Sequence, residues 1–157
     1  MSINKFVIIP ILALILSNTA SLVAGDSTKD NAIGMWGGKW DGSWPIVLTI
    51  EATEKPDTYK VRYQWVENWG NAELSTRDSI VQKTDDYFKT GRLVFRMTET
   101  NGLIYGDFKN PRRSNLVRLS SSYQPSINTI AEELKKCGWK RKVISAQDAL
   151  KEITGEP

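Results

Sequence analysis

Between residues 34 and 120, short runs in which apolar and polar residues alternate are separated by turn-forming residues. The clearest run covers residues 58–66, and its apolar members are Tyr59, Val61, Tyr63 and Trp65. Successive side chains of a strand point to opposite sides, so each run predicts a strand with one face in a core and one in water. The alternation therefore favours a β-rich fold over a helical one.

The spacing of the runs predicts an antiparallel meander. We expect strands in residues 34–44, 46–51, 58–66, 72–83, 91–98, 103–108 and 115–120. Asn101-Gly102 is a strong signal for a tight hairpin. About seven or eight short strands joined by tight turns are typical of an antiparallel sandwich or barrel. Because consecutive hairpins leave two open edges that only closure removes, we expect an all-β, up-and-down barrel.

Three tryptophans and four glycines are concentrated in residues 34–44. Trp36, Trp40 and Trp44 are spaced four apart, which fits one face of a strand and also one face of a helix. Glycine weakens helices, so we expect an extended strand with all three rings on one side.

The pattern changes after Pro125, where helix signals replace alternation. A capping box at residues 129–132 and a stop at Gly138 predict one short helix. Ser145 and Gly155 delimit a second. Helices this short are not stable alone and should pack on the barrel or on a partner. We therefore divide the mature chain into a barrel domain, residues 34–123, and a helical C-terminal tail, residues 124–157.

Residues 1–25 have the layout of a secretory signal peptide. Lys5 precedes an apolar run, residues 6–16, and small and polar residues complete the segment. We expect cleavage before Asp26, with residues 26–33 as a flexible lead-in. A membrane anchor is the alternative, but the run is shorter than the roughly 20 apolar residues that span a bilayer. The sequence thus predicts an exported protein, periplasmic or secreted.

Near the start of the barrel domain a Trp-x-Gly element leads into an Ile/Val/Leu strand, and its last strands contain Gly102-x-x-x-Gly106-x-Phe108 and Leu116-x-Arg118-Leu119. Together these motifs resemble the calycin-type β-barrels, which include lipocalins, fatty-acid-binding proteins and avidins. Lipocalin-like domains of this kind also occur in bacterial exported proteins. The resemblance covers residues 34–120 and implies a calycin-like barrel that binds a small ligand.

In lipocalins the tryptophan of a Gly-x-Trp element on the first strand packs under the barrel, and an arginine of the last strand lies across its ring. The resemblance assigns Gly38 and Trp40 to the first role and Arg118 to the second, while Gly34-x-Trp36 and Gly42-x-Trp44 compete for the assignment. A guanidinium over an indole face gains about 0.5–2 kcal/mol. The resemblance does not identify a ligand.

The residues present exclude several kinds of chemistry. The chain contains no histidine, which removes His-dependent nucleophilic catalysis and the usual zinc, copper and non-haem iron ligand sets. No glycine-rich phosphate loop follows a strand, and no spacing pairs two carboxylates. Cys137 is the only cysteine; neighbouring lysines would favour a thiolate, but a buried, inert thiol is the commoner outcome. We expect no metal, no cofactor and no enzymatic activity.

Aromatic residues crowd the first half of the domain and are the candidate ligand-binding residues: Trp36, Trp40, Trp44, Tyr63, Trp65 and Trp69. Large rings are usually core filling, and a barrel needs them. Rings at the mouth of a barrel, notably Trp65 and Trp69, would instead form a stacking platform or the wall of an apolar pocket. Both interpretations can hold for different members.

Positive charge gathers late in the chain and defines a candidate basic face: Lys109, Arg112, Arg113, Lys140, Arg141 and Lys142. Such a run of like charges usually faces water. The alternative is that it binds an anionic surface. The whole-chain net charge of +3 is too small to indicate nucleic acid.

The sequence leads to two hypotheses for the function. The first is a barrel that binds a small apolar or ring-shaped ligand. The second is an interaction module that docks a protein or an anionic surface through the basic face and helical tail.

Overall fold

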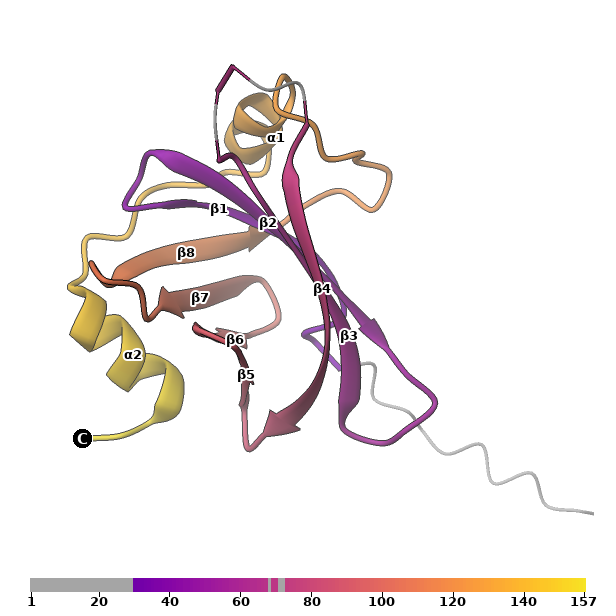
Figure 1. Cartoon of the computed structure of the whole chain (residues 1–157), viewed down its shortest axis with the longest axis vertical. Coiled ribbons are helices and arrows are strands. Elements are labelled where there is room, and N and C mark those ends of the chain that lie inside the picture. The colour runs from indigo at the N-terminus through magenta and orange to yellow at the C-terminus, as the bar shows by residue number, and fades with distance from the viewer. Residues whose placement is uncertain (1–29, 68, 71–72) are drawn as a thin grey trace, which may run out of the picture.

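The computed structural model describes residues 30–67, 69–70 and 73–157, and the predicted signal peptide lies outside them. Eight antiparallel strands close into a barrel in sequence order (Figure 1). The strands are β1 (Gly34–Trp40), β2 (Trp44–Ala52), β3 (Thr58–Trp65), β4 (Ser75–Thr84), β5 (Tyr87–Thr90), β6 (Leu93–Met97), β7 (Asn101–Gly106) and β8 (Arg112–Arg118). Two helices follow, α1 (Ile130–Lys136) and α2 (Ala146–Thr154). The all-β, up-and-down barrel predicted from the alternation is confirmed.

The tryptophan-rich stretch is two strands, and its prediction as one strand was wrong. Asp41 and Gly42 have positive φ angles of 51° and 85°, so the chain reverses there. Trp40 and Trp44 consequently lie opposite each other on β1 and β2. Glycine adopts such angles without strain, which explains its place in this turn.

Two details of the second half also differ from the prediction. Residues 87–90 form a separate strand, β5, which the alternation did not predict. Asn101 and Gly102 lie within β7 instead of forming the turn, which closes between Thr98 and Asn101 through a backbone hydrogen bond of 2.7 Å. Gly102 is opposite Met97, and a Cβ there would overlap the Met97 Sδ atom. Close packing across the strands, and not a turn, explains this glycine.

Inward-facing side chains fill one half of the barrel. The largest are fully buried: Trp36, Phe88, Phe95, Ile46, Leu48, Ile50, Ile104 and Leu116. Phe88 and Phe95 stack with their ring centroids 5.1 Å apart, and Tyr59 meets Phe88 edge-on at 5.2 Å. This half of the interior is a packed core, as is common in narrow barrels.

Both helices pack on the outside of the barrel. Leu134 of α1 is buried with Val47 of β2 and Val117 of β8. Ile153 of α2 packs over β6 and β7 in the same way, and α2 lies beside these strands in Figure 1. The apolar stripes of the tail are therefore satisfied within the chain. Neither helix is long and apolar enough to span a membrane, as judged over the described residues.

The ends of the helices confirm most of the predicted signals. Ser145 caps α2 by accepting a hydrogen bond from the Asp148 backbone N–H, at 3.0 Å, and Gly155 ends it with φ 73°. Gly138 follows α1 with φ 76°. The capping box at the start of α1 was wrong: the Thr129 side chain does not cap the helix and instead meets Ser126 Oγ at 2.6 Å.

Candidate functional site

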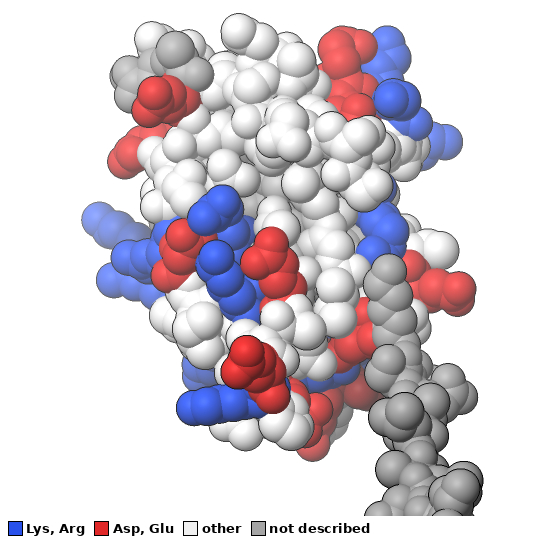
Figure 2. All heavy atoms as spheres, turned by 90° about the vertical axis from the view of Figure 1, so that its right-hand side faces the viewer, with Lys and Arg blue, Asp and Glu red and all other residues white. Residues whose placement is uncertain are grey.

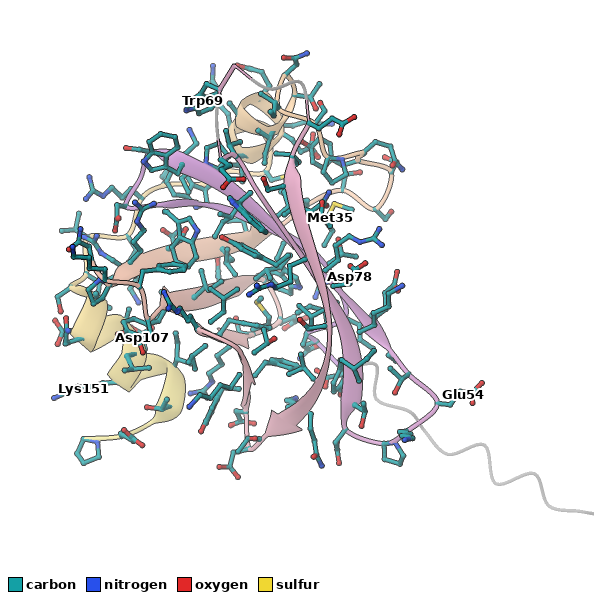
Figure 3. The ribbon with its side chains drawn as sticks, in the orientation of Figure 1. Met35, Glu54, Trp69, Asp78, Asp107 and Lys151 are labelled. Atoms are coloured by element: carbon teal, nitrogen blue, oxygen red, sulfur yellow. The ribbon has the colours of Figure 1, made fainter. Side chains whose placement is uncertain are left out.

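The two ends of the barrel have different roles. The β1–β2, β3–β4, β5–β6 and β7–β8 connections lie at one end, which we name the open end. The β2–β3, β4–β5 and β6–β7 turns lie at the other, the closed end. Figure 3 shows Trp69 of the β3–β4 connection and Glu54 of the β2–β3 turn at opposite extremes of the molecule. Each candidate residue can be placed by the end to which it belongs.

At the closed end Arg118 covers Trp36, not Trp40. The Arg118 guanidinium carbon lies 4.4 Å from the centre of the Trp36 ring, and Trp36 is directly opposite Arg118 in the β1–β8 register. Its Nη1 donates to the Ile33 carbonyl at 2.8 Å, and the Trp36 indole N–H donates to the Ala32 carbonyl at 2.8 Å. The predicted tryptophan–arginine closure thus exists, but its assignment to Trp40 was wrong. Strand register, which motif spacing does not reveal, decided between the two.

Gly38 contributes to closure of the barrel through close backbone contact, not through a packed side chain. A Cβ at Gly38 would lie 2.5 Å from the Asn115 carbonyl oxygen and 2.5 Å from Ser114 Oγ. The buried Ser114 hydroxyl accepts a hydrogen bond from the Lys39 backbone N–H at 2.9 Å. Only a residue without a side chain lets β1 and β8 approach this closely.

Residues 30–33, predicted as part of a flexible lead-in, pack against the closed end. Ala32 is buried, and the Asp30 carboxylate receives hydrogen bonds from the Tyr59 hydroxyl and from Lys83 Nζ, the latter at 3.0 Å. Burial alone would raise the pKa of Asp30, but the bonds from Tyr59, the Ala32 N–H and Lys83 outweigh it and hold the pKa below its usual range. Burial and the Asp30 carboxylate together raise the pKa of Tyr59 to about 12.

The open end contains a cavity of about 790 Å³. Its lining combines apolar and charged residues: Trp40, Trp44, Tyr63, Trp65, Val66, Glu67, Arg77, Gly91, Arg92, Leu93, Phe108, Lys109, Asn110 and Arg112. β4 pairs with β5 only through Lys83 and Thr84. Because Arg77 of β4 and Gly91 of the β5–β6 turn both line the cavity, it extends to the part of the wall where these strands separate.

Hydrogen bonding and ring contacts fix the aromatic wall of the cavity. The Trp40 indole N–H donates to the Tyr63 hydroxyl at 2.8 Å, and Tyr63 stacks on Trp65 with ring centroids 4.8 Å apart. Phe108 meets Trp40 edge-on at 5.8 Å. Burial raises the pKa of Tyr63 to about 12, so its hydroxyl stays protonated at neutral pH. These rings are held in place before any ligand arrives.

Trp44 and Trp69 form the outer rim of the same cavity region. Their ring centroids are 6.4 Å apart with the planes tilted by 33°. Trp69 is 52% exposed and Trp44 37% exposed, unusually high values for tryptophan. Of the six aromatic residues proposed from the sequence, the open end brings together Trp40, Trp44, Tyr63, Trp65 and Trp69, while Trp36 belongs to the closed end.

Comparison with known protein families finds no match, and comparison with curated protein sequences finds no relative. The arrangement of the residues therefore carries the functional argument. The closed, eight-stranded antiparallel barrel is consistent with a calycin-like fold.

Charged side chains around the cavity are mostly basic. Arg77, Arg92, Lys109 and Arg112 line it together with a single carboxylate, Glu67. On the face shown in Figure 2, by contrast, acidic and basic side chains are interspersed around a central area without charged side chains.

The members of the predicted basic face take part in different contacts. Lys109 and Arg112 line the cavity, whereas Arg113 is bound to Asp41 and to the Ile144 carbonyl. Lys142 pairs with Glu152 at 2.7 Å. The two remaining members, Lys140 and Arg141, belong to the segment between α1 and α2; the Lys140 carbonyl accepts from Asn115, and the Arg141 stem packs near Gly42. Arg112, Arg113 and Arg141 thus all approach the Asp41-Gly42 turn.

Cys137 does not gain reactivity from its neighbouring lysines. Burial, followed by the charge and hydrogen bonding of Glu133, raises the pKa of the thiol above its usual value. The thiol lies 3.6 Å from Glu133 Oε1. A raised pKa disfavours the nucleophilic thiolate, so the structure supports the inert interpretation of this cysteine.

The cavity residues that were not predicted from the sequence include Arg77, Arg92 and Phe108, besides Val66, Glu67, Gly91, Leu93 and Asn110. Phe108 belongs to one of the motifs that carried the calycin resemblance, but nothing in its spacing placed it against Trp40. Arg77 and Arg92 are isolated in sequence, and Arg92 is placed beside the β7–β8 connection by a hydrogen bond from the Asp107 N–H to its carbonyl, at 2.7 Å. When a charge cluster is formed by side chains from different strands, no local sequence pattern predicts it.

Proposed function

We propose that this protein is a non-enzymatic, lipocalin-like binding protein that holds a small, largely apolar or ring-shaped ligand in the open end of its barrel. The observation that supports it most is the cavity of about 790 Å³ with an aromatic wall at the open end of the barrel. Pockets for small molecules typically have volumes of about 300–1,000 Å³ and apolar walls with a few polar groups. Export through residues 1–25 is part of the same proposal.

The positions of the rings suit a planar or apolar ligand. Trp40, Tyr63 and Phe108 are anchored by their contacts with one another, so they offer fixed faces at little cost in side-chain entropy. Trp44 and Trp69 are exposed at the rim, where covering them would remove large apolar area from water. The docking alternative gains less support, because the apolar faces of α1 and α2 already lie on the barrel.

A neutral aromatic probe tests this proposal. Phenylnaphthylamine fluoresces strongly when it leaves water, so titration into the full mature chain reports occupancy of an apolar cavity. We expect saturable binding of one probe per chain. Trp65→Ala removes a cavity wall and should weaken binding about tenfold or more, because losing a large apolar contact costs about 1.5–3 kcal/mol.

Trp139→Ala is the matched control for this experiment. Trp139 packs on the outside of the barrel, where its indole N–H donates to the Asn115 carbonyl at 2.8 Å. Its loss should leave the probe affinity unchanged once circular dichroism shows that the variant is folded. No probe binding, or equal effects of the two substitutions, would contradict ligand binding in the cavity.

A further inference from the structure

The cavity contains more positive charge than the described residues neutralise. Among them, no carboxylate lies within 4.0 Å of the charged nitrogens of Arg77, Arg92 or Lys109. Arg112 is only loosely paired, with its Nε 3.9 Å from Asp41 Oδ2. Asp41 is bound more closely by Arg113. Within the described residues, no close carboxylate offsets the positive charge of Arg77, Arg92 or Lys109.

Among the described residues the cavity lining contains one carboxylate, Glu67, and it forms no ion pair within 4.0 Å. Glu67 Oε2 accepts a hydrogen bond from the Ser75 hydroxyl at 2.7 Å. Glu67 belongs to the β3–β4 connection, whereas Arg92 and Lys109 belong to the β5–β6 and β7–β8 connections. The Asp107 N–H···O=C Arg92 hydrogen bond ties those last two connections together. Arg92 and Lys109 thus lie on adjacent connections, Arg112 follows Lys109 at the start of β8, and the Arg77 guanidinium approaches Gly91.

We infer that the ligand is an amphipathic organic acid, an inference that rests on the proposed binding function. Its apolar or ring-shaped body lies against the aromatic wall, and its carboxylate, sulfate or phosphate is held at the opening by Arg77, Arg92, Lys109 and Arg112. Guanidinium groups bind such oxyanions with paired, charge-assisted hydrogen bonds, and lysine adds a mobile positive charge. An anion there would supply the counter-charge that the protein lacks, while a neutral ligand would leave the cations unpaired.

Two probes with the same ring skeleton isolate the effect of the acid group. Anilinonaphthalenesulfonate is phenylnaphthylamine with one added sulfonate, so the ratio of their affinities reports the charge alone. We expect the anionic probe to bind the mature protein about tenfold tighter or more at low ionic strength. This preference should shrink as salt is added, because salt screens charges at a solvent-accessible opening.

Charge-removing variants locate the effect. Arg92→Gln combined with Lys109→Gln should abolish most of the preference for the anion, because it should weaken binding of the anionic probe by a much larger factor than binding of the neutral probe. Lys135→Gln, on the exposed surface of α1, removes a positive charge that is not part of the cavity lining and should change neither affinity.

The outcomes separate this inference from the function on which it rests. If the neutral probe binds but the anion has no advantage, or if the double variant keeps the full preference, the acid-group inference is overturned and the binding function remains. If neither probe binds, or if Trp65→Ala affects neither, both are overturned. An equal response to Lys135→Gln and to the double variant would show only a general charge effect and would also overturn the inference.

Discussion

Individual side chains in the open end are held by few but specific contacts, and Tyr63 is the clearest example. Its hydroxyl accepts the Trp40 indole N–H at 2.8 Å, and its ring stacks on Trp65. Trp40 is 3% exposed, so its N–H has no access to bulk water. One hydroxyl therefore satisfies a buried donor and fixes two rings of the cavity wall.

Tyr63→Phe keeps the ring and removes the acceptor. We expect the free energy of unfolding to fall by about 1–3 kcal/mol, because the Trp40 N–H is left buried without a partner. Urea denaturation followed by circular dichroism measures this directly. Tyr87→Phe is the control: Tyr87 is half-buried on β5, and no hydrogen bond of its hydroxyl is found within the described residues. A smaller loss for Tyr63→Phe than for Tyr87→Phe would refute the role assigned to the hydroxyl.

The strands β1 and β8 form the seam that turns the meander into a barrel. Their ladder is short, with three opposed pairs from Trp36–Arg118 to Gly38–Leu116. Ser114 extends it by accepting the Lys39 N–H, and the Leu119 N–H donates to the Met35 carbonyl at 2.8 Å. Closure of the barrel thus depends on the close approach of the β1 and β8 backbones near Gly38.

Gly38→Ala and Gly37→Ala make a matched pair for testing this seam. A Cβ at position 38 meets a backbone carbonyl at 2.5 Å, whereas one at position 37 meets the methyl groups of Leu134 and Leu119, at 2.7–2.9 Å, which can rotate away. We expect Gly38→Ala to lower the free energy of unfolding by about 1–3 kcal/mol and Gly37→Ala to cost less. Urea denaturation measures both values. Equal losses of unfolding free energy for the two variants would show that β1 and β8 can move apart at this seam without an added cost.

The molecule as a whole divides stability and binding between its two ends. The closed end contains the filled core, the Arg118–Trp36 contact and the Asp30 carboxylate that links the chain before β1 to β3 and β4. The open end contains the cavity and the unneutralised cations. A filled end lets the protein stay folded while the other end keeps space for a ligand.

Titration of the closed end should give the protein a stability that falls at both extremes of pH. The folded-state pKa of Asp30 is lowered, so its contribution is present above about pH 4, its unfolded pKa, and is lost as the pH falls further. The pKa of Tyr59 is raised to about 12, so its contribution is complete below about pH 10 and is lost as the pH rises towards 12. Urea denaturation across this pH range measures both.

Asp30→Asn should lower stability at neutral pH by about 1–3 kcal/mol and flatten the acid-side loss, since a charged acceptor is replaced by a neutral one. Tyr59→Phe should flatten the alkaline side. Asp78→Asn is the control, because Asp78 pairs with Arg62 on the exposed outer face of β4 (Figure 3) and should leave the acid-side profile nearly unchanged. If Asp30→Asn leaves the pH dependence of the free energy of unfolding unchanged, the contacts of the Asp30 carboxylate with β3 and β4 do not stabilise the protein.

Alternation alone identified most strands, since one face of each is buried whatever its neighbours are. It failed where tertiary contacts set the boundary. The Asp41-Gly42 turn split the tryptophan stretch, and β5, only four residues long, was too short to show a period. The Asn101-Gly102 pair suited a turn equally well, but the packing of Met97 placed it in a strand.

The all-β meander, the helical tail and the lack of histidine-dependent chemistry can be predicted from residue types and their local period. The three-dimensional structure was needed to establish that Arg118 covers Trp36, that Asp30 joins β3 and β4, and that Arg77, Arg92, Lys109 and Arg112 line one cavity. These contacts depend on strand register, because the side chains that meet across a barrel are set by the stagger of strands far apart in the chain. Local spacing does not encode that stagger.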